Sequence, residues 1–297
     1  MSRATINDPG RTRRTPSART GWPIRWGLCA AFVLALLSVP AHALPPDQAT
    51  VSYNLGLAHI AGGRYPEAID TLREAIRLDP DYADAWHALG VAYAHVGRNV
   101  EAVDAYRQAV RLNPQEATAW YNLGIAYGNL ARYPEAVDAY REAVRLTPDS
   151  ADAWHNLGFA YAQLARYPEA VDAYREAVQL NPTNADAWHN LGFAYAKLAR
   201  YPEAIDAYRE VVRIHPDRAV AWYSLGVTYT ALNRYADAID PLRQAVRLNP
   251  DSADAWYVLG IAYAGSGDRI AALECVQPLR RIDPARADAL FNVVGPR

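Results

Sequence analysis

Apolar residues recur along most of the chain with the spacing of one face of an α-helix. In residues 151–184 a first stripe has the spacing i, i+3, i+4, i+7 and consists of Trp154, Leu157, Gly158 and Tyr161. A second stripe of helical spacing follows and consists of Ala170, Val171, Tyr174, Ala177 and Val178. This segment is therefore predicted to contain two amphipathic helices.

The residues between the two stripes mark helix ends. Tyr167-Pro168-Glu169 predicts the start of the second helix, because proline fits the first turn and glutamate favours the positive end of the helix dipole. Asn181-Pro182 predicts the end of that helix, because proline cannot continue it. Asp186 then stands near the start of the next helix, where an acid is again favourable.

The same pattern repeats every 34 residues. The repeated glycines are Gly56, Gly90, Gly124, Gly158, Gly192, Gly226 and Gly260. The repeated prolines are Pro80, Pro114, Pro148, Pro182, Pro216, Pro250 and Pro284. The repeated tryptophans are Trp86, Trp120, Trp154, Trp188, Trp222 and Trp256. Such self-similarity indicates a solenoid rather than separate globular domains. We expect the repeated Trp, Leu, Gly, Tyr and Ala residues to form its core.

These residues resemble the tetratricopeptide repeat, with its W-x-x-L-G-x-x-Y motif followed by Ala, an aromatic residue, Ala and Pro. The resemblance covers seven units, at 49–82, 83–116, 117–150, 151–184, 185–218, 219–252 and 253–286. It implies an all-α fold, a right-handed superhelical α-solenoid of antiparallel helix pairs. It also implies that the first helices line a concave groove that binds a peptide or protein.

The end units depart from the pattern. Ser52 replaces Trp and His59 replaces Tyr in the first unit. Pro241 and Pro278 fall inside predicted second helices, where each is expected to kink its helix. Residues 44–48 form a short lead, and residues 287–297 resemble a truncated eighth first helix with little polar cover for the end of the stack.

Three sets of equivalent residues stand on the predicted groove face of the central units. They place an aromatic or imidazole ring, an amide and an apolar side chain in each of three consecutive units. We expect a ligand to contact Tyr121, Asn122, Ile125, His155, Asn156, Phe159, His189, Asn190 and Phe193. The asparagines are similar to the asparagine ladder of some tetratricopeptide domains, which holds a peptide backbone. The alternative is that they bond only to neighbouring loops or water.

Composition and motifs narrow the function. The chain is 51% hydrophobic with a net charge of −2, which excludes a disordered polyelectrolyte and gives no sign of nucleic-acid binding. It contains no phosphate-binding glycine loop, H-E-x-x-H or G-x-S-x-G motif, and Cys275 is expected to be a buried thiol. We therefore expect no enzymatic activity, no cofactor and no small-molecule substrate.

Three aspartate–histidine pairs suggest two alternative roles for the groove face, a metal site or a pH-responsive surface. The pairs are Asp84 with His87, Asp152 with His155 and Asp186 with His189. A closed metal site would need ligands from adjacent units, and helix axes about 8–10 Å apart are too distant for a shared ion. We expect no metal.

The first 43 residues have the parts of a secretory signal peptide. Six arginines and one aspartate precede an apolar stretch at 27–39, which ends before Ala41-His42-Ala43. Thirteen apolar residues are too few to span a bilayer, which needs about 20. An uncleaved membrane anchor is the alternative. Export predicts a periplasmic or secreted protein whose membrane association is limited to export.

The sequence thus predicts an exported protein–protein interaction scaffold. Two other functions stay open. One is a structural solenoid that self-assembles by end-to-end stacking into a homo-oligomer. The other is a non-catalytic accessory subunit of an envelope enzyme complex.

Cleavage of the leader is directly testable. We expect the exported protein to begin at Leu44, because the A-x-A arrangement ends at Ala43. N-terminal sequencing of the secreted form measures this. Recovery of intact residues 1–43 in the membrane fraction would instead indicate an anchor.

Overall fold

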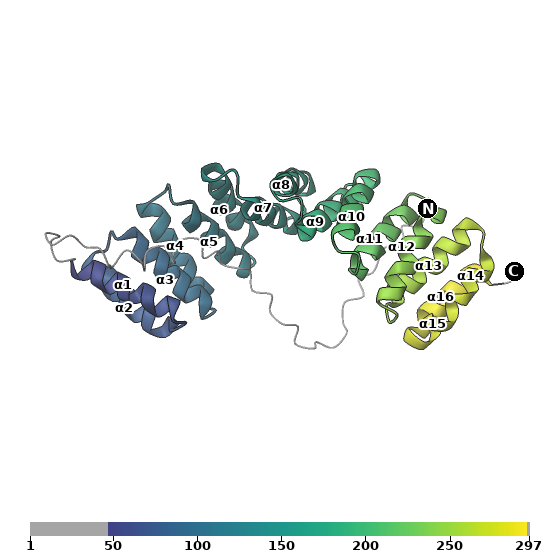
Figure 1. Cartoon of the computed structure of the whole chain (residues 1–297), viewed down its shortest axis with the longest axis horizontal. Helices are drawn as coiled ribbons and strands as arrows, with labels where there is room; N and C mark the ends of the chain where they lie inside the picture. Colours follow the sequence, from purple (N-terminus) through teal and green to yellow (C-terminus); the bar gives the residue numbers. More distant parts are fainter. Residues whose placement is uncertain (1–46, 296–297) are drawn as a thin grey trace, which may run out of the picture. The chain divides into compact units, whose positions relative to one another are not determined.

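The computed structural model describes residues 47–295, which are α-helical throughout apart from short turns (Figure 1). The first helices of the seven units are α1 (Gln48–Ala61), α3 (Ala83–His95), α5 (Ala117–Asn129), α7 (Ala151–Gln163), α9 (Ala185–Lys197), α11 (Ala219–Ala231) and α13 (Ala253–Ser266). The second helices of the first six units are α2 (Tyr65–Leu78), α4 (Asn99–Leu112), α6 (Tyr133–Leu146), α8 (Tyr167–Leu180), α10 (Tyr201–Ile214) and α12 (Tyr235–Leu248). The chain ends in α14 (Arg269–Glu274), α15 (Val276–Ile282) and α16 (Pro284–Val294). The predicted leader lies outside the described residues.

Each second helix packs on its own first helix and on the first helix of the next unit. This arrangement confirms the all-α solenoid of helix pairs. Within residues 47–295, no helix is both long enough and apolar enough to cross a membrane.

A tight contact between glycine and a large side chain joins the two helices of each of the first six units. A Cβ atom on Gly158 would lie 2.7 Å from the ring of Tyr174, and one on Gly124 would lie 2.5 Å from Tyr140. Atoms cannot approach so closely, so only glycine lets the buried tyrosine reach the first helix. Leu72 takes the place of tyrosine in the first unit.

The turn between the helices of a unit holds one residue in the left-handed region. That residue is Gly63, Gly97, Ala131, Ala165, Ala199, Asn233 or Gly267. An L-residue with a Cβ costs roughly 1–2 kcal/mol in this conformation. The three central units, which use alanine, therefore carry backbone strain that the first two units and the seventh avoid with glycine.

The tryptophans connect each unit to the preceding turn. In all six units that contain one, the indole Nε1–H donates to the carbonyl of the proline six residues earlier, at 2.8–3.0 Å. The tryptophans are half-buried rather than fully buried. Trp188 packs against the buried Ala185, Val211 and Ala221, so one side of the indole contributes to the core, as expected, while the rest of the ring is exposed where it bonds to the turn.

The stack curves toward its first helices. Successive first helices contact one another from α1 to α9 and again from α11 to α13, whereas no pair of successive second helices from α2 to α12 approaches to the same extent. The first helices therefore line the inner side of the curve, and the second helices spread apart on the outer side.

The two unusual prolines behave differently. Helix α12 continues without a break through the buried Pro241. The second helix of the seventh unit is divided at Cys275 into α14 and α15, which places Pro278 in a first helical turn, where it needs no hydrogen-bond donor. The kink predicted from proline thus becomes a break only in the seventh unit.

The C-terminal segment closes the end of the stack more fully than the sequence predicts. Leu290 of α16 packs against Gly260, at the place that Tyr or Leu of the unit's own second helix takes elsewhere. The Arg269 guanidinium donates to the carbonyl of Val294 at 2.8 Å and to that of Gly295. Helix α16 thus packs onto the seventh unit like the first helix of a further repeat, and its Phe291 and Val293 stay exposed.

The indole–carbonyl bond can be isolated by substitution. We expect Trp154→Phe to lower the free energy of unfolding by about 1 kcal/mol, the usual contribution of a hydrogen bond. Trp154→Ala should cost about 3 kcal/mol, the lower end of the range for aromatic truncations, because the ring is only half-buried. Thermal unfolding followed by circular dichroism measures both, and the melt should broaden because each unit contacts only its neighbours. Equal stability of Trp154→Phe and the unaltered protein would mean that the bond contributes nothing.

Candidate functional site

The expected groove residues lie on the first helices, but they differ in accessibility. Asn122 and Asn156 are only 4% exposed, and Ile125 is also buried. The half-buried members are Tyr121, His155, Phe159, His189 and Asn190. Phe193 is 42% exposed. The expectation that all three amides are open to a ligand is therefore wrong at Asn122 and Asn156, which the packing between units covers.

The asparagines connect successive first helices. Asn122 Nδ2 lies 3.0 Å from His87 Nε2, and Asn190 Nδ2 lies 3.0 Å from His155 Nε2. Asn156 Nδ2 donates to the Tyr121 hydroxyl at 3.1 Å. In each case the partner belongs to the preceding unit, so the amides hold units together. This matches neither a free ladder nor bonds to loops or water alone.

The series of bonds ends where the asparagine is replaced. Ser224 stands at the position that would face His189, and Nε2 of His189 is buried without a hydrogen-bond partner among the described residues. In the described part of the chain, this series of asparagine bonds therefore extends from α3 to α9.

Burial controls the charge state of the histidines. Burial lowers the pKa of His87 to about 4, although Asp84 acts in the opposite direction. Burial also lowers the pKa of His155 and of His189. At neutral pH these rings are uncharged. Within residues 47–295, no three His, Cys, Asp or Glu side chains gather closely enough to hold a metal ion.

A partly accessible aromatic patch lies where the first helices α7 and α9 meet the starts of the preceding second helices α6 and α8. Phe159 lies edge-on to Tyr133 with ring centroids 6.4 Å apart, and Phe193 lies edge-on to Tyr167 at 6.3 Å. The Lys197 ammonium lies 5.1 Å from the centroid of Phe193. These five residues, which we call the aromatic patch, combine apolar area with a positive charge.

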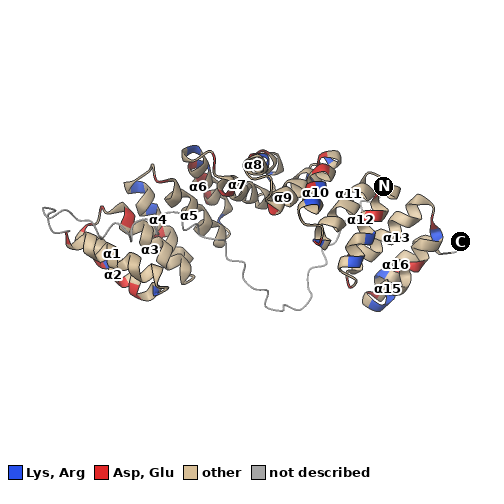
Figure 2. Cartoon of the chain, viewed as in Figure 1, with Lys and Arg blue, Asp and Glu red and all other residues tan. Residues whose placement is uncertain are grey.

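Charge separates the two sides of the stack. Figure 2 shows that Lys, Arg, Asp and Glu lie mainly on second helices and turns. Helices α1, α5 and α11 contain no Asp, Glu, Lys or Arg at all. The inner surface is therefore poor in charge compared with the outer surface.

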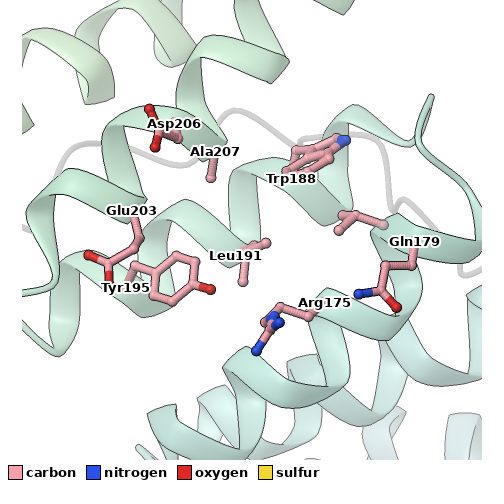
Figure 3. Close-up of a pocket in the computed structure, with 9 residues that line it drawn as sticks. Arg175, Gln179, Trp188, Leu191, Tyr195, Glu203, Asp206 and Ala207 are labelled. Carbon is pink, nitrogen blue, oxygen red and sulfur yellow. The ribbon is translucent and has the colours of Figure 1, made fainter.

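The outer side contains two equivalent crevices that the sequence analysis did not identify. One, of about 480 Å³, lies between α6 and α8 over α7, and the other, of about 290 Å³, lies between α8 and α10 over α9. The second is lined by Arg175, Val178, Gln179, Trp188, Leu191, Tyr195, Glu203, Asp206 and Ala207 (Figure 3). Arginine lines one wall, carboxylates line the other, and the floor is aromatic and apolar.

The crevices follow from the curvature, because second helices that spread apart leave space over the first helix between them. Their sequence signal is the 34-residue repetition of charged residues, such as Arg141 and Arg175 or Asp172 and Asp206. In the next unit, Arg209 crosses to the Tyr229 hydroxyl and donates to it at 2.6 Å. A sequence pattern cannot distinguish that arrangement from an open crevice.

Cys275 is buried next to the break between α14 and α15. Burial raises the pKa of its thiol to about 12. The reactive thiolate is therefore scarce at neutral pH.

Family models match nearly all of the described residues. Models described as tetratricopeptide repeats match residues 35–83, 53–117, 105–138, 183–251 and 223–284. A model described as a TPR repeat matches residues 132–165 and 161–198. No curated protein matches the sequence significantly.

Solved structures share the fold. YrrB, described as a TPR protein with an unusual peptide-binding site, is 27% identical, and the match covers 62% of this chain and 95% of YrrB with a TM-score of 0.58. MamA is 25% identical, with 56% of this chain and 96% of MamA covered and a TM-score of 0.53. The C-terminal part of a TPR repeat-containing protein from Cytophaga hutchinsonii is 14% identical, with 80% and 99% covered and a TM-score of 0.68. This last likeness concerns the fold alone.

The lowered pKa of the half-buried His87 predicts a pH dependence of stability. An unfolded histidine titrates near 6.5, whereas folded His87 titrates near 4. Between these values the unfolded chain binds a proton that the folded chain excludes, so stability falls as the pH drops from 6.5 to 4, by about 3 kcal/mol from this residue. We expect His87→Tyr to remove most of this loss. Tyrosine already stands at the equivalent position in four other units, at Tyr53, Tyr121, Tyr223 and Tyr257.

Urea unfolding at pH 7 and pH 4.5 measures the effect. The control is His215→Tyr at an exposed residue, in which the acid loss should persist. An unchanged acid loss in His87→Tyr would show that the excluded proton is not on His87.

Proposed function

The chain belongs to the tetratricopeptide repeat family, and on this premise we propose that it is an exported protein–protein interaction scaffold that binds a peptide or protein segment along its first helices. The single observation that carries this proposal is the aromatic patch. Phe193 is 42% exposed on a charge-poor surface, with Phe159 in the equivalent position one unit earlier. Large aromatic side chains are the residues that most often dominate binding energy at protein interfaces.

The chemistry of the patch favours a ligand with apolar or aromatic side chains. Lys197 over the Phe193 ring adds a positive charge at one edge, where an acidic group of the ligand would be attracted. Asn190 lies beside Phe193 in the sequence of α9 and is half-buried rather than closed off. Its amide is the one member of the asparagine series that is partly accessible to a bound backbone.

The likeness to YrrB supports a peptide ligand, because YrrB is described as a TPR protein with a peptide-binding site. The basic and apolar leader supports export, which would place the scaffold in the periplasm or outside the cell. Members of this family generally act without catalysis, so a role as accessory subunit of an enzyme complex is a variant of the same proposal.

The outer crevices are the second candidate site. The observation that favours binding there is that two adjacent crevices have equivalent charged walls. A partner bound there would contact arginines of the second helices instead of phenylalanines of the first helices.

Paired substitutions distinguish the two surfaces. The chain is used as bait in an envelope extract, and a recovered partner is titrated by calorimetry. We expect Phe159→Ala with Phe193→Ala to weaken binding at least about tenfold, because truncating an anchor removes more than about 1.4 kcal/mol. Arg141→Ala with Arg175→Ala serves as the matched control on the outer side and should leave the affinity unchanged. Circular dichroism verifies that both variants stay folded. The reverse result would assign the site to the crevices.

A further inference from the structure

The first helix exposes a face that every later first helix buries. Val51 and Leu55 of α1 are 50% and 48% exposed, and Ala58 on the same face is also exposed. In the six later units the residue equivalent to Leu55 is also a leucine, and each of these leucines is only 2–3% exposed. They are Leu89, Leu123, Leu157, Leu191, Leu225 and Leu259. The equivalents of Val51 are alanines that are buried in all six later units. The face is thus the surface through which units pack together.

In the later units this face is covered by the second helix of the preceding unit. Helix α1 has no preceding unit among the described residues. At the opposite end of the stack, α16 already fills the corresponding gap, with Ala287, Leu290 and Val294 buried. The two ends are therefore unlike, and among residues 47–295 it is the N-terminal end that retains a packing face that no other helix covers.

We propose that α1 packs against α1 of a second copy of the chain, related by a two-fold axis. Helix α1 contains no Asp, Glu, Lys or Arg, so two identical faces meet without repulsion between like charges. An antiparallel arrangement also brings complementary charges together. Asp47 caps the start of α1 and Arg64 follows its end, so each aspartate lies near the arginine of the other copy. A two-fold contact of this kind is closed and yields a dimer.

This dimer differs from end-to-end stacking. Head-to-tail growth would need α16 to pack on α1, through the exposed Phe291 and Val293. Such a contact is heterologous and leaves a free end on every assembly, so it would produce chains of increasing length. The α1 interface leaves the inner surface and the aromatic patch free, and it does not depend on the proposed ligand.

The mass of the full-length gene product in solution tests the proposal. The protein is purified as the cell processes it, and sedimentation is measured over a wide range of concentrations. We expect a monomer–dimer equilibrium. Leu55→Asp should raise the dissociation constant about a hundredfold, because the dimer would bury an unpaired carboxylate. Leu180→Asp is the matched control, since Leu180 is 42% exposed on α8, and it should leave the equilibrium unchanged.

Cross-linking distinguishes the two geometries. In a Cys29→Ser background and with a short bis-maleimide, Ala58→Cys should cross-link to itself, whereas the same background without Ala58→Cys, whose Cys275 is buried, should not. A cross-link that requires Ala58→Cys mixed with Val293→Cys, together with growth beyond a dimer, would overturn the two-fold interface in favour of stacking. A monomer at all concentrations would also overturn it.

Discussion

The contact between a glycine in each first helix and a large side chain opposite it is the constraint on which the rest of the solenoid depends. A methyl group on Gly158 would overlap the ring of Tyr174, so the first helix needs a residue without a side chain at that position. The contact sets how closely the two helices pair and buries a tyrosine or leucine between them. The seventh unit keeps the contact although its second helix is broken, because Leu290 arrives from α16 to fill the same place. The packing site is preserved even where the connectivity of the repeat is not.

Pairing at this distance, repeated along the chain, produces two different surfaces. First helices contact each other on the inside of the curve, and their side chains are largely uncharged. Second helices spread apart on the outside, carry most of the charge and leave crevices over the intervening first helices. A ligand with mainly apolar side chains and a ligand with mainly charged side chains would therefore bind opposite sides of the same stack.

The asparagines show how a polar residue on the inner surface can serve the fold rather than a ligand. Asn122 and Asn156 are buried and bonded to rings of the preceding unit, so their amides already have partners. Buried amides need such partners, because an unsatisfied polar group costs about 1–3 kcal/mol. His189 lacks this partner where Ser224 replaces asparagine, and the polar link between α9 and the start of α11 is instead the ion pair of Asp186 with Arg218, at 2.7 Å.

The sequence by itself determined the helix pairs, their period and their packing residues. Helical spacing, proline at helix starts and glycine at close contacts are local requirements, and the same residues meet them in nearly every unit. Only the tertiary structure decided which side chains remain accessible. Asn122 and Phe193 both stand on first helices in similar patterns, yet one is buried between units and the other is exposed. The same holds for Leu55 and Leu157, which are identical in the repeat but differ in whether a preceding second helix covers them. The accessibility of a side chain depends on how neighbouring units pack and on the curvature of the stack. Both result from contacts between residues far apart in the sequence, which a local sequence pattern does not specify.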